Sequence, residues 1–493
     1  MSVEYDAVIV GSGPNGLAAA IALARAGCSV LVREANATIG GGARSAELTL
    51  PEFVHDVCSA VHPLAAGSPY FKTLQLERFG LEWIQPAIPL AHPLDDGTAA
   101  CLYRDVDLTA KQFRGDSRAY QGLMKPLARN WDKLANELLG PMLHFPRHPW
   151  ALARFGIPAI CPATFLSKVL FKGEPARALV AGMAAHSFLP LQAPASSAFA
   201  LVLALAGHAV GWPIPRGGSQ QIANALANCL CQLGGKIEVG CRVRDLNELP
   251  KSRATLLDVS VWEFLRIAGE RLPVAYRRRL ESFRHAPGIF KIDYALSNPV
   301  PWKAEACRHA GTLHLGGGIQ EIAAAERDVS EGKIPERPFV LAAQQSLFDN
   351  TRAPGGRHTL WVYCHTPFNC SVDLSDHIES QIERFAPGFR DCILARHKMN
   401  AGDFEKSNPN LRGGDINGGA ANLKQLIARP ILSPTPYRTP LPGVYLCSAS
   451  TPPGGGVHGM CGYHAARAAL RDLPMASHAG LGGSQSCKCR FFY

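Results

Sequence analysis

The sequence predicts an α/β protein with a discontinuous Rossmann-like domain and a second domain of α+β structure. Three observations support this fold class: a strand, glycine turn and helix at the N-terminus, a similar unit near the C-terminus, and a length of 493 residues. A chain of that length is expected to form two domains. Apolar residues make up 47% of the chain and charged residues 18%, as in globular proteins and unlike disordered ones.

The N-terminal unit reads as an apolar strand over residues 6–10, an Ala/Leu-rich helix over about 15–26 and a second strand, SVLVRE. The turn between the first strand and the helix has the pattern G-x-G-x-x-G. Gly11 permits the tight turn, Gly13 lets the backbone approach a pyrophosphate, and Gly16 brings the helix close to the strand. This setting favours dinucleotide binding over a structural turn.

The residues after the second strand narrow the choice of dinucleotide. Glu34 ends that strand and is placed to bind ribose hydroxyls, which disfavours the 2′-phosphate of NADP and leaves NAD and FAD. A second glycine cluster, Gly40 to Gly42, and Arg44 follow directly. They suit a cofactor that extends along the strand ends, although a flexible loop is the alternative.

Cysteine usage and charge restrict the other function classes. None of the 15 cysteines forms a C-x-x-C pair or a zinc-ligand spacing, so we expect reduced thiols, no metal site and a cytoplasmic protein without a secretion signal. No apolar run is long enough to span a bilayer, and no basic and aromatic pattern indicates nucleic-acid binding. The net charge of +10 is compatible with anionic partners such as a membrane surface. Much of that charge lies over 271–285, where the pattern favours a solvated arginine face over a lipid-binding one.

Three segments carry a resemblance to a known family: VIVGSGPNGLAAAIALARAG, Glu34 with IGGGARS, and GVYLCSASTPPGGGVHGMCGYHAARAAL. Together they resemble the phytoene desaturase-like FAD-dependent oxidoreductases of the amine oxidase and carotenoid desaturase superfamily. Middle blocks such as HPLDDGTAACLYRD and PRGGSQQIANAL are similar to its uncharacterised bacterial branch. The resemblance extends to about residue 473, and it implies FAD as the cofactor.

The resemblance also implies which residues contact FAD. In such proteins the C-terminal strand and its glycine-rich turn return to the cofactor domain and close over the flavin. Many relatives have an acidic residue soon after that strand, but here residues 447–450 read Cys-Ser-Ala-Ser, so no acid is carried over. The contacts expected are Gly11, Gly13, Pro14, Asn15, Gly16, Glu34, Gly41, Gly42, Ala43, Arg44, Val243, Gly454, Gly455, Gly456, Val457 and Met460.

A domain plan follows from the same resemblance. We expect a glutathione-reductase-type FAD-binding domain over residues 1–75, 213–262 and 430–473. The substrate domain would take residues 76–212 and 263–429, and residues 474–493 would form a disordered tail. The substrate domain contains apolar helices over 177–211 and three candidate strands, IFKIDYAL, FVLAAQQS and HTLWVYCHT.

The expected reaction is hydride transfer from an apolar substrate to flavin, in a dehydrogenation, isomerisation or oxidation. The apolar helices over 177–211 favour such a substrate, and a carotenoid-like molecule is the family-level expectation. The chain has no second G-x-G-x-x-G in a βαβ setting and no C-x-x-x-x-C near the first helix. We therefore expect electrons to leave to oxygen, a quinone or another acceptor, and not through a disulfide-reductase relay.

The sequence leaves the catalytic residues unknown and offers three candidates. His62 follows the expected flavin loop, where a base or a flavin contact competes with a structural histidine. His458 stands inside the C-terminal glycine-rich turn, and Asp415 stands in GGDINGG, where a turn-capping role is the alternative.

Two other functions remain open at this stage. A flavin amine or amino-acid oxidase would need an aromatic cage around a substrate amine. A non-catalytic escort or binding protein can share this architecture, although the intact glycine turns and Glu34 argue against loss of the flavin site.

Overall fold

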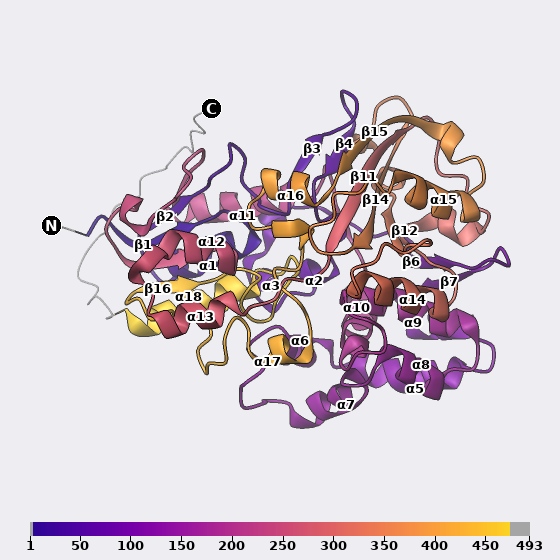
Figure 1. Cartoon of the computed structure of the whole chain (residues 1–493), viewed down its shortest axis with the longest axis horizontal. Coiled ribbons are helices and arrows are strands. Elements are labelled where there is room, and N and C mark those ends of the chain that lie inside the picture. Colours follow the sequence, from indigo (N-terminus) through magenta and orange to yellow (C-terminus); the bar gives the residue numbers. More distant parts are fainter. Residues whose placement is uncertain (1–2, 474–493) are drawn as a thin grey trace.

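The computed structural model describes residues 3–473, and the fold is mixed α/β, as the sequence predicts (Figure 1). The chain forms two parts, each built on its own main sheet. The tail that the sequence analysis expects to be disordered, residues 474–493, lies outside the described residues.

The first part contains a five-stranded parallel sheet. In spatial order its strands are β16 (Val444–Leu446), β10 (Ser252–Leu257), β1 (Tyr5–Val10), β2 (Val30–Arg33) and β9 (Lys236–Glu238). β1 pairs with β2 on one side and with β10 on the other, and β10 also pairs with β16. Segments from the start, middle and end of the chain therefore share one sheet.

Helices cover both faces of this sheet, as a parallel sheet requires. They are α1 (Pro14–Arg25), α11 (Gln220–Gln232) and α18 (Met460–Asp472) on one face, and α12 (Val261–Ala268) and α13 (Val274–Glu281) on the other. Leu280 and Phe283 are buried with Val10 of β1 in the second layer. This layer therefore continues well beyond residue 262, where the sequence analysis placed a domain boundary.

The start of α1 is fixed by its sequence. Gly13 is the N-cap residue, and Pro14 occupies the first turn, where its missing N–H is not needed. Leu and Ala then continue the helix because both are strong helix formers. α18 packs closely against α1, since a Cβ added to Gly462 would lie 1.8 Å from the Asn15 carbonyl oxygen. The start of α1 is held in place from two sides, by β1 and by α18.

The second part contains a seven-stranded mixed sheet. Its strands are β15 (Ile393–Met399), β11 (Gly288–Leu296), β14 (His358–Thr366), β13 (Val340–Ala343), β12 (Ala310–Leu315), β6 (Ile88–Pro93) and β7 (Ala99–Leu102). β11, β13 and β14 coincide with the three strands that the sequence analysis expects. β12 and β6 are parallel, and the other neighbours are antiparallel.

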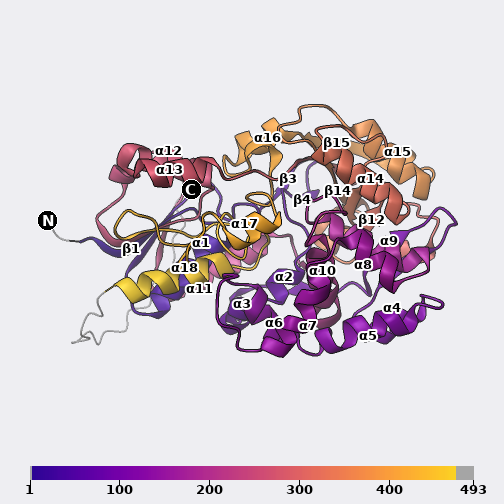
Figure 2. The same cartoon turned by 60° about the horizontal axis from the view of Figure 1, so that its bottom comes forward.

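A group of helices lies below this sheet (Figure 2). They are α5 (Ser117–Ala128), α6 (Trp131–Leu138), α7 (Pro149–Ala159), α8 (Ala163–Leu170), α9 (Glu174–Ala185) and α10 (Ser196–Val210). α14 (Ile319–Ser330) packs on α9, and α15 (Ser375–Phe385) lies near β12. Within residues 3–473, no helix combines the length and the apolar character needed to cross a bilayer.

Candidate active site

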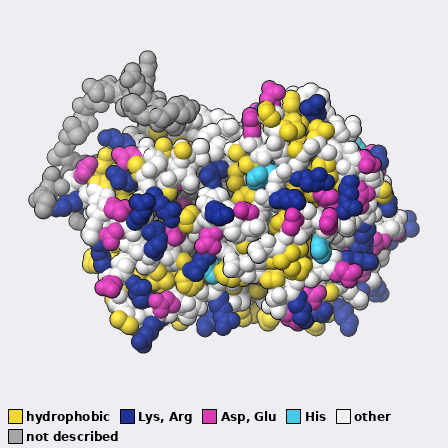
Figure 3. Space-filling view, turned by 45° about the horizontal axis from the view of Figure 1, so that its top comes forward, with side chains coloured by type: hydrophobic (Ala, Val, Ile, Leu, Met, Phe, Trp, Pro, Cys, Tyr) yellow, Lys and Arg dark blue, Asp and Glu magenta, His cyan; other side chains and the backbone are white. Residues whose placement is uncertain are grey.

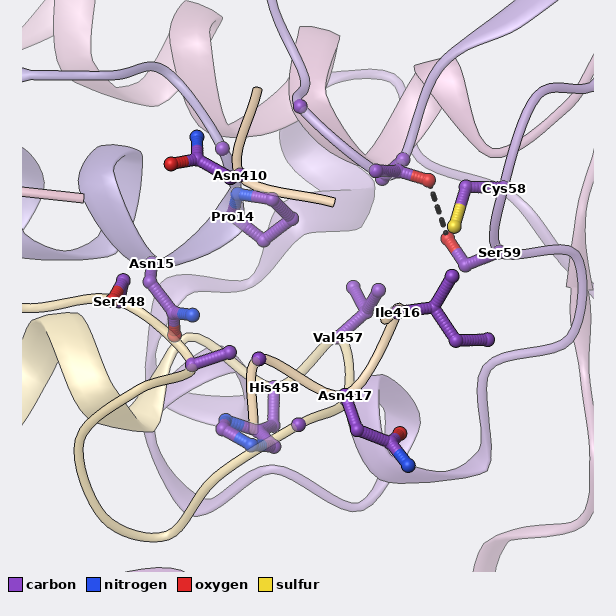
Figure 4. A pocket seen from close by; sticks show the side chains of 18 of the residues that line it. Pro14, Asn15, Cys58, Ser59, Asn410, Ile416, Asn417, Ser448, Val457 and His458 are labelled. Carbon is purple, nitrogen blue, oxygen red and sulfur yellow. Dashed lines mark hydrogen bonds between the residues drawn. The ribbon is translucent and has the colours of Figure 1, made fainter. Parts of the chain in front are cut away.

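A cavity of about 560 Å³ joins the two parts of the molecule. One end is lined by the glycine turn after β1, and the other by aromatic and apolar side chains of α10, β13 and β14. Figure 4 shows Pro14 and Asn15 at the start of α1 on one side of this space, and Cys58 and Ser59 on the other. We call these the dinucleotide end and the substrate end.

The three glycines of the first turn are required by close contacts. Gly11 has φ +97°, and a Cβ there would lie 2.8 Å from the Asp258 carbonyl oxygen. A Cβ on Gly16 would lie only 2.1 Å from the Gly11 carbonyl oxygen, so this residue lets α1 start against β1. Gly11, Gly13, Pro14 and Asn15 line the cavity, whereas Gly16 lies behind it.

Glu34 lies buried in the wall at the dinucleotide end. Its Oε2 accepts hydrogen bonds from the Ser12 N–H at 3.0 Å and the Ser12 hydroxyl at 2.6 Å. Its Oε1 accepts from the Asn36 N–H at 2.8 Å. The carboxylate is therefore fixed in position at the end of β2, where the sequence analysis expects a ribose.

Asp258, at the end of β10, is a site residue that the sequence analysis missed. Its Oδ2 accepts a hydrogen bond from the Gly16 N–H at 2.8 Å, and the residue lines the cavity. Burial raises the pKa of this carboxyl to about 7, opposed by the Gly16 hydrogen bond and assisted by the charge of Glu34. The available signal was an acid at the end of an apolar strand, TLLD, but only the sheet order places it beside β1.

The second glycine cluster lies against the first. A Cβ on Gly41 would lie 3.1 Å from the Cα of Gly13, so only glycine permits this approach. Gly42 and Ala43 also line the cavity, and the Ser59 hydroxyl donates to the Gly42 carbonyl at 3.0 Å (Figure 4). Ser59 and its neighbour Cys58 are further wall residues that the sequence analysis did not single out.

Arg44 does not reach the cavity wall, contrary to the contact expected from the sequence. Its Nε donates to the Gly41 carbonyl at 2.9 Å, and its guanidinium also donates to the Ser407 carbonyl at 3.3 Å. The side chain is committed to these backbone groups, so it supports the glycine cluster from behind.

The C-terminal turn closes the cavity from the other side. Gly455, Gly456 and Val457 line it, as does the backbone region around Val243. Gly454 and Met460 lie outside the wall. A Cβ on Gly454 would lie 3.5 Å from the guanidinium carbon of Arg429, and Met460 is buried at the start of α18.

Arg429 holds the C-terminal turn in place. The residue is buried, and its guanidinium donates to the carbonyls of Ala449 at 2.9 Å, Asn417 at 3.0 Å and Gly418 at 2.8 Å. These bonds tie the loop after β16 to the segment around residues 416–418, which also lines the cavity. The glycine-rich turn is therefore an ordered part of the wall.

Several buried polar atoms of wall residues have no hydrogen-bond partner in the described part of the chain, and Asn15 Oδ1, Asn417 Nδ2 and His458 Nε2 are among them. Buried polar atoms are nearly always paired, so each of them fits a polar group of a bound ligand. Together with the glycine turns and Glu34, they fit a dinucleotide cofactor that extends from the end of β2 to the C-terminal turn.

Of the three catalytic candidates, two line the cavity and one does not. Burial lowers the pKa of both His62 and His458 to about 4, so both are neutral at pH 7. His62 Nε2 bonds to the Ser219 hydroxyl at 2.8 Å, and His458 Nδ1 accepts from the Met460 N–H at 3.0 Å. Asp415 lies outside the wall and accepts from the N–H groups of Ala286 and Asn417, which is the capping role given as its alternative.

The substrate end has an aromatic floor. Trp361 and Tyr363 of β14 meet edge to face with ring centroids 5.1 Å apart, and Phe188 and Trp212 add to the wall. Alternate residues of a strand point to one face, which is why residues 361 and 363 both reach the cavity. The acidic residues of the described wall are Glu34, Asp258 and Glu263, all at the dinucleotide end.

His186 is the histidine at the substrate end of the described wall. Its Nε2 lies 2.9 Å from Nε2 of His314, and its Nδ1 has no partner among residues 3–473. Burial lowers the pKa of His186 to about 3, so the imidazole is neutral at pH 7. Sequence reasoning gave no signal for this residue, because its place depends on the packing of α9 against the sheet.

A second histidine lies beneath the floor. His365 Nδ1 bonds to both carboxylate oxygens of Glu326 at 2.8 and 2.9 Å, and the ring of Phe188 covers it with centroids 3.9 Å apart. Phe188 has φ +57°, a backbone conformation that bulky residues rarely adopt. This strained residue separates the buried His365–Glu326 pair from the cavity.

Comparisons with known proteins agree with this architecture. A family model described as an NAD(P)-binding Rossmann-like domain matches residues 9–74. The mouse (Mus musculus) pyridine nucleotide-disulfide oxidoreductase domain-containing protein 2 is 28% identical, over 95% of this chain and 94% of its own.

Two solved structures share the fold. An oxidoreductase from Methanosarcina mazei has a TM-score of 0.62 at 16% identity, covering 94% of this chain and 99% of its own. Cyclohexylamine oxidase from Brevibacterium oxydans has a TM-score of 0.58 at 17% identity, covering 95% and 99%. The solved structures agree with the fold of this chain, and the mouse relative is named for an oxidoreductase domain.

Proposed function

We propose that this protein is an FAD-dependent oxidoreductase that dehydrogenates, isomerises or oxidises an apolar small molecule. The observation that carries the proposal is one continuous cavity, which runs from a dinucleotide-type glycine turn to an aromatic floor. The acidic side chains of its described wall all lie at the dinucleotide end, so the floor is apolar. A carotenoid-like substrate and transfer of the electrons to oxygen or a quinone are the finer parts of the same proposal.

Residues of the dinucleotide end would hold the cofactor. Glu34 is placed for the ribose, the turn from Gly11 to Asn15 for the pyrophosphate, and the C-terminal turn from Gly455 to His458 for the flavin. His458 uses Nδ1 as an acceptor, so its neutral ring carries the proton on Nε2 and offers a donor to the ligand. The flavin, when bound, would supply hydride or single-electron transfer.

Residues of the substrate end would bind the apolar molecule and keep water away. Phe188, Trp212 and Trp361 are each less than 10% exposed, so a ligand between them loses its contact with solvent. Removal of a hydride together with a proton needs a proton acceptor. His186 is the candidate for this role by its position, because its Nδ1 has no partner among residues 3–473 while Nε2 shares a hydrogen bond with His314. Its pKa of about 3 makes the unliganded imidazole a weak base, so the role requires that the bound ligands raise that pKa.

An amine oxidase is the second candidate function. The edge-to-face pair of Trp361 and Tyr363 favours it, since aromatic rings can surround a substrate amine. Cyclohexylamine oxidase from Brevibacterium oxydans, which shares the fold, is consistent with an amine oxidase. However, the part of the substrate end formed by residues 3–473 has no carboxylate to pair with a charged amine, so the apolar substrate is the better proposal.

The first experiment is the visible absorbance spectrum of the purified protein before and after anaerobic dithionite. We expect a flavin spectrum that bleaches on reduction. Anaerobic mixing with terpenoid, carotenoid and amine panels would then show which class bleaches the flavin, and re-oxidation would be followed with oxygen and with a quinone. A colourless protein that does not take up added FAD would exclude the oxidoreductase. Bleaching by amines alone would select the second candidate.

A further inference from the structure

Several large apolar side chains of α7, α8 and the loop before α7 are exposed outside the cavity. Figure 2 shows where these two helices lie. Phe145 is 98% exposed, Trp150 88%, Ile157 73% and Val169 63%. We define the α7–α8 surface by six exposed side chains: Phe145, Trp150, Ile157, Ile160, Phe165 and Val169. Exposed large apolar side chains that gather on neighbouring elements of a chain are a feature of interaction sites.

The exposed apolar residues form a regular pattern on α7. Trp150 and Ile157 are seven residues apart, which places them on one face of a helix, while Phe155 and Ala159 are buried on the opposite face. The outward face of α7 is therefore apolar, in the place where a surface helix normally carries polar side chains.

The loop before α7 is held in a defined conformation. Glu137 is buried, and its Oε1 accepts from the N–H groups of Arg147 at 2.8 Å and His148 at 3.0 Å. Its other oxygen bonds to the ring of His144. Phe145 stands between these anchored residues, so its exposure is imposed by the hydrogen bonds of the loop.

The chain segment that carries this surface has charges of one sign. Residues 141–173 contain Arg147, Arg154, Lys168 and Lys172 and no Asp or Glu. Elsewhere the two signs are mixed, as on the face at the top of the molecule, where acidic and basic side chains alternate (Figure 3). Exposed aromatic and aliphatic residues among cations are the features of a surface that binds anionic lipid.

The α7–α8 surface is continuous with the cavity. Leu138, Leu139 and Met142 precede the exposed residues in the chain and line the cavity, and so does Phe155 on the inner side of α7. Met142 is itself 49% exposed. An apolar molecule that leaves this surface therefore meets the wall of the cavity directly.

We propose that the α7–α8 surface docks on a bilayer with anionic headgroups and that the apolar substrate enters the cavity from that bilayer. The second clause rests on the proposed function, but the first does not. A second copy of the chain fits this surface less well, because a two-fold contact would bring four more cations against these four with no carboxylate between them.

The test is co-sedimentation of the purified protein with vesicles of phosphatidylcholine alone or with about one third phosphatidylglycerol. We expect binding to the anionic vesicles. Trp150→Ser combined with Ile157→Ser should lower the bound fraction at least about tenfold, because both side chains are exposed and only their lipid contact is lost. Arg154→Gln and Lys168→Gln should each lower the association constant about fivefold. Val372→Ser is the matched control, since Val372 is 47% exposed between β14 and α15, outside this surface, and should bind as the wild type does.

Brominated acyl chains would identify the docking face. They should quench part of the tryptophan fluorescence on binding, and Trp150→Phe should keep the binding but lose most of that quenching. Equal binding by the Trp150→Ser/Ile157→Ser variant and the wild type, or quenching that persists in Trp150→Phe, would overturn the proposal. A third result would also overturn the proposal: the wild type is a dimer in sedimentation velocity, the double substitution dissociates it, and neither the dimer nor the monomer binds vesicles. The flavin spectrum is a separate readout, so failure of the docking and failure of the proposed function are distinguishable.

Discussion

The two ends of the cavity are built in different ways. The dinucleotide end consists mainly of backbone. An added Cβ on Gly11, Gly16 or Gly41 would lie only 2.1 to 3.1 Å from a main-chain atom, and Glu34 supplies a buried carboxylate. The substrate end consists of large side chains, such as Phe188 and Trp361, that come from elements far apart in the chain. At the dinucleotide end, even an added methyl group on Gly11 or Gly16 would clash with main-chain atoms. At the substrate end, other large apolar side chains could take the same space.

This difference predicts separable effects of substitution. Changes at the dinucleotide end should remove the cofactor, and changes at the substrate end should alter turnover while the flavin spectrum remains. Four predictions examine this contrast, from the largest expected effect to the smallest.

Gly16→Ala should abolish flavin binding and destabilise the protein by about 3 kcal/mol, because the added methyl group would meet the Gly11 carbonyl oxygen. The flavin content of the purified protein and urea unfolding would measure the two effects. Gly122→Ala, on α5 with no atom within 4 Å of the added Cβ, is the control and should keep the full flavin content. Normal flavin content in Gly16→Ala would contradict the close contact of α1 with β1.

His186→Gln should lower kcat about a hundredfold and leave the flavin spectrum unchanged, because Gln cannot accept the proton that His186 Nδ1 would take. Single-turnover bleaching of the flavin would measure the chemical step, and its pH profile would show whether a proton acceptor was lost. His285→Gln, which changes a half-buried histidine outside the cavity wall, is the control. An unchanged rate in His186→Gln would remove the residue from the reaction.

Glu34→Gln should weaken flavin binding about tenfold to a hundredfold, because a charge-assisted contact to the ribose would become a neutral one. Flavin fluorescence on release would give the dissociation constant. Glu47→Gln serves as the control, since Glu47 is exposed on β3 (Ser45–Glu47). Equal flavin dissociation constants for Glu34→Gln and Glu47→Gln would show that Glu34 does not contact the ribose.

Asp258 should make the free energy of unfolding depend on pH. Its folded pKa of about 7 lies above the ordinary value of 3.8, so its contribution is fully present below pH 4 and is lost as the pH rises through 7. The slope is expected to stay below about 1.4 kcal/mol per pH unit, since the residue is only partly buried without ligand. Urea unfolding from pH 4 to 8 without added dinucleotide would measure it. Asp258→Asn should flatten the curve, and an equal slope in both proteins would assign the pH dependence to another group.

The sequence was most informative about the part of the site whose residues lie close together in the chain. The pattern from Gly11 to Gly16, Glu34 at the end of the next strand and the glycine cluster around Gly41 lie within one short stretch. Gly16 and Gly41 have their steric partners within this stretch, whereas Gly11 and Gly13 lie against Asp258, which is distant in the chain. The strand–turn–helix unit could therefore be predicted before any contact was known.

The direction of individual side chains was less predictable. Arg44 and Asp415 stand in glycine-rich segments that suggested ligand contacts, yet both are committed to backbone groups of the protein. Each side chain has one partner nearby in the chain, Gly41 for Arg44 and Asn417 for Asp415. Each also has a distant one, Ser407 for Arg44 and Ala286 for Asp415, which the local sequence does not reveal.

By itself, the sequence determined the strand–glycine turn–helix units at both ends of the chain and the acid that follows the second strand, because these depend on short-range sterics. Only the tertiary structure placed Asp258 beside the glycine turn, His186 and Trp361 at the far end of the same cavity, and an apolar face of α7 outside it. These residues meet through sheet order and helix packing between segments that are distant in the chain. Such contacts depend on the whole fold, so no local pattern records them.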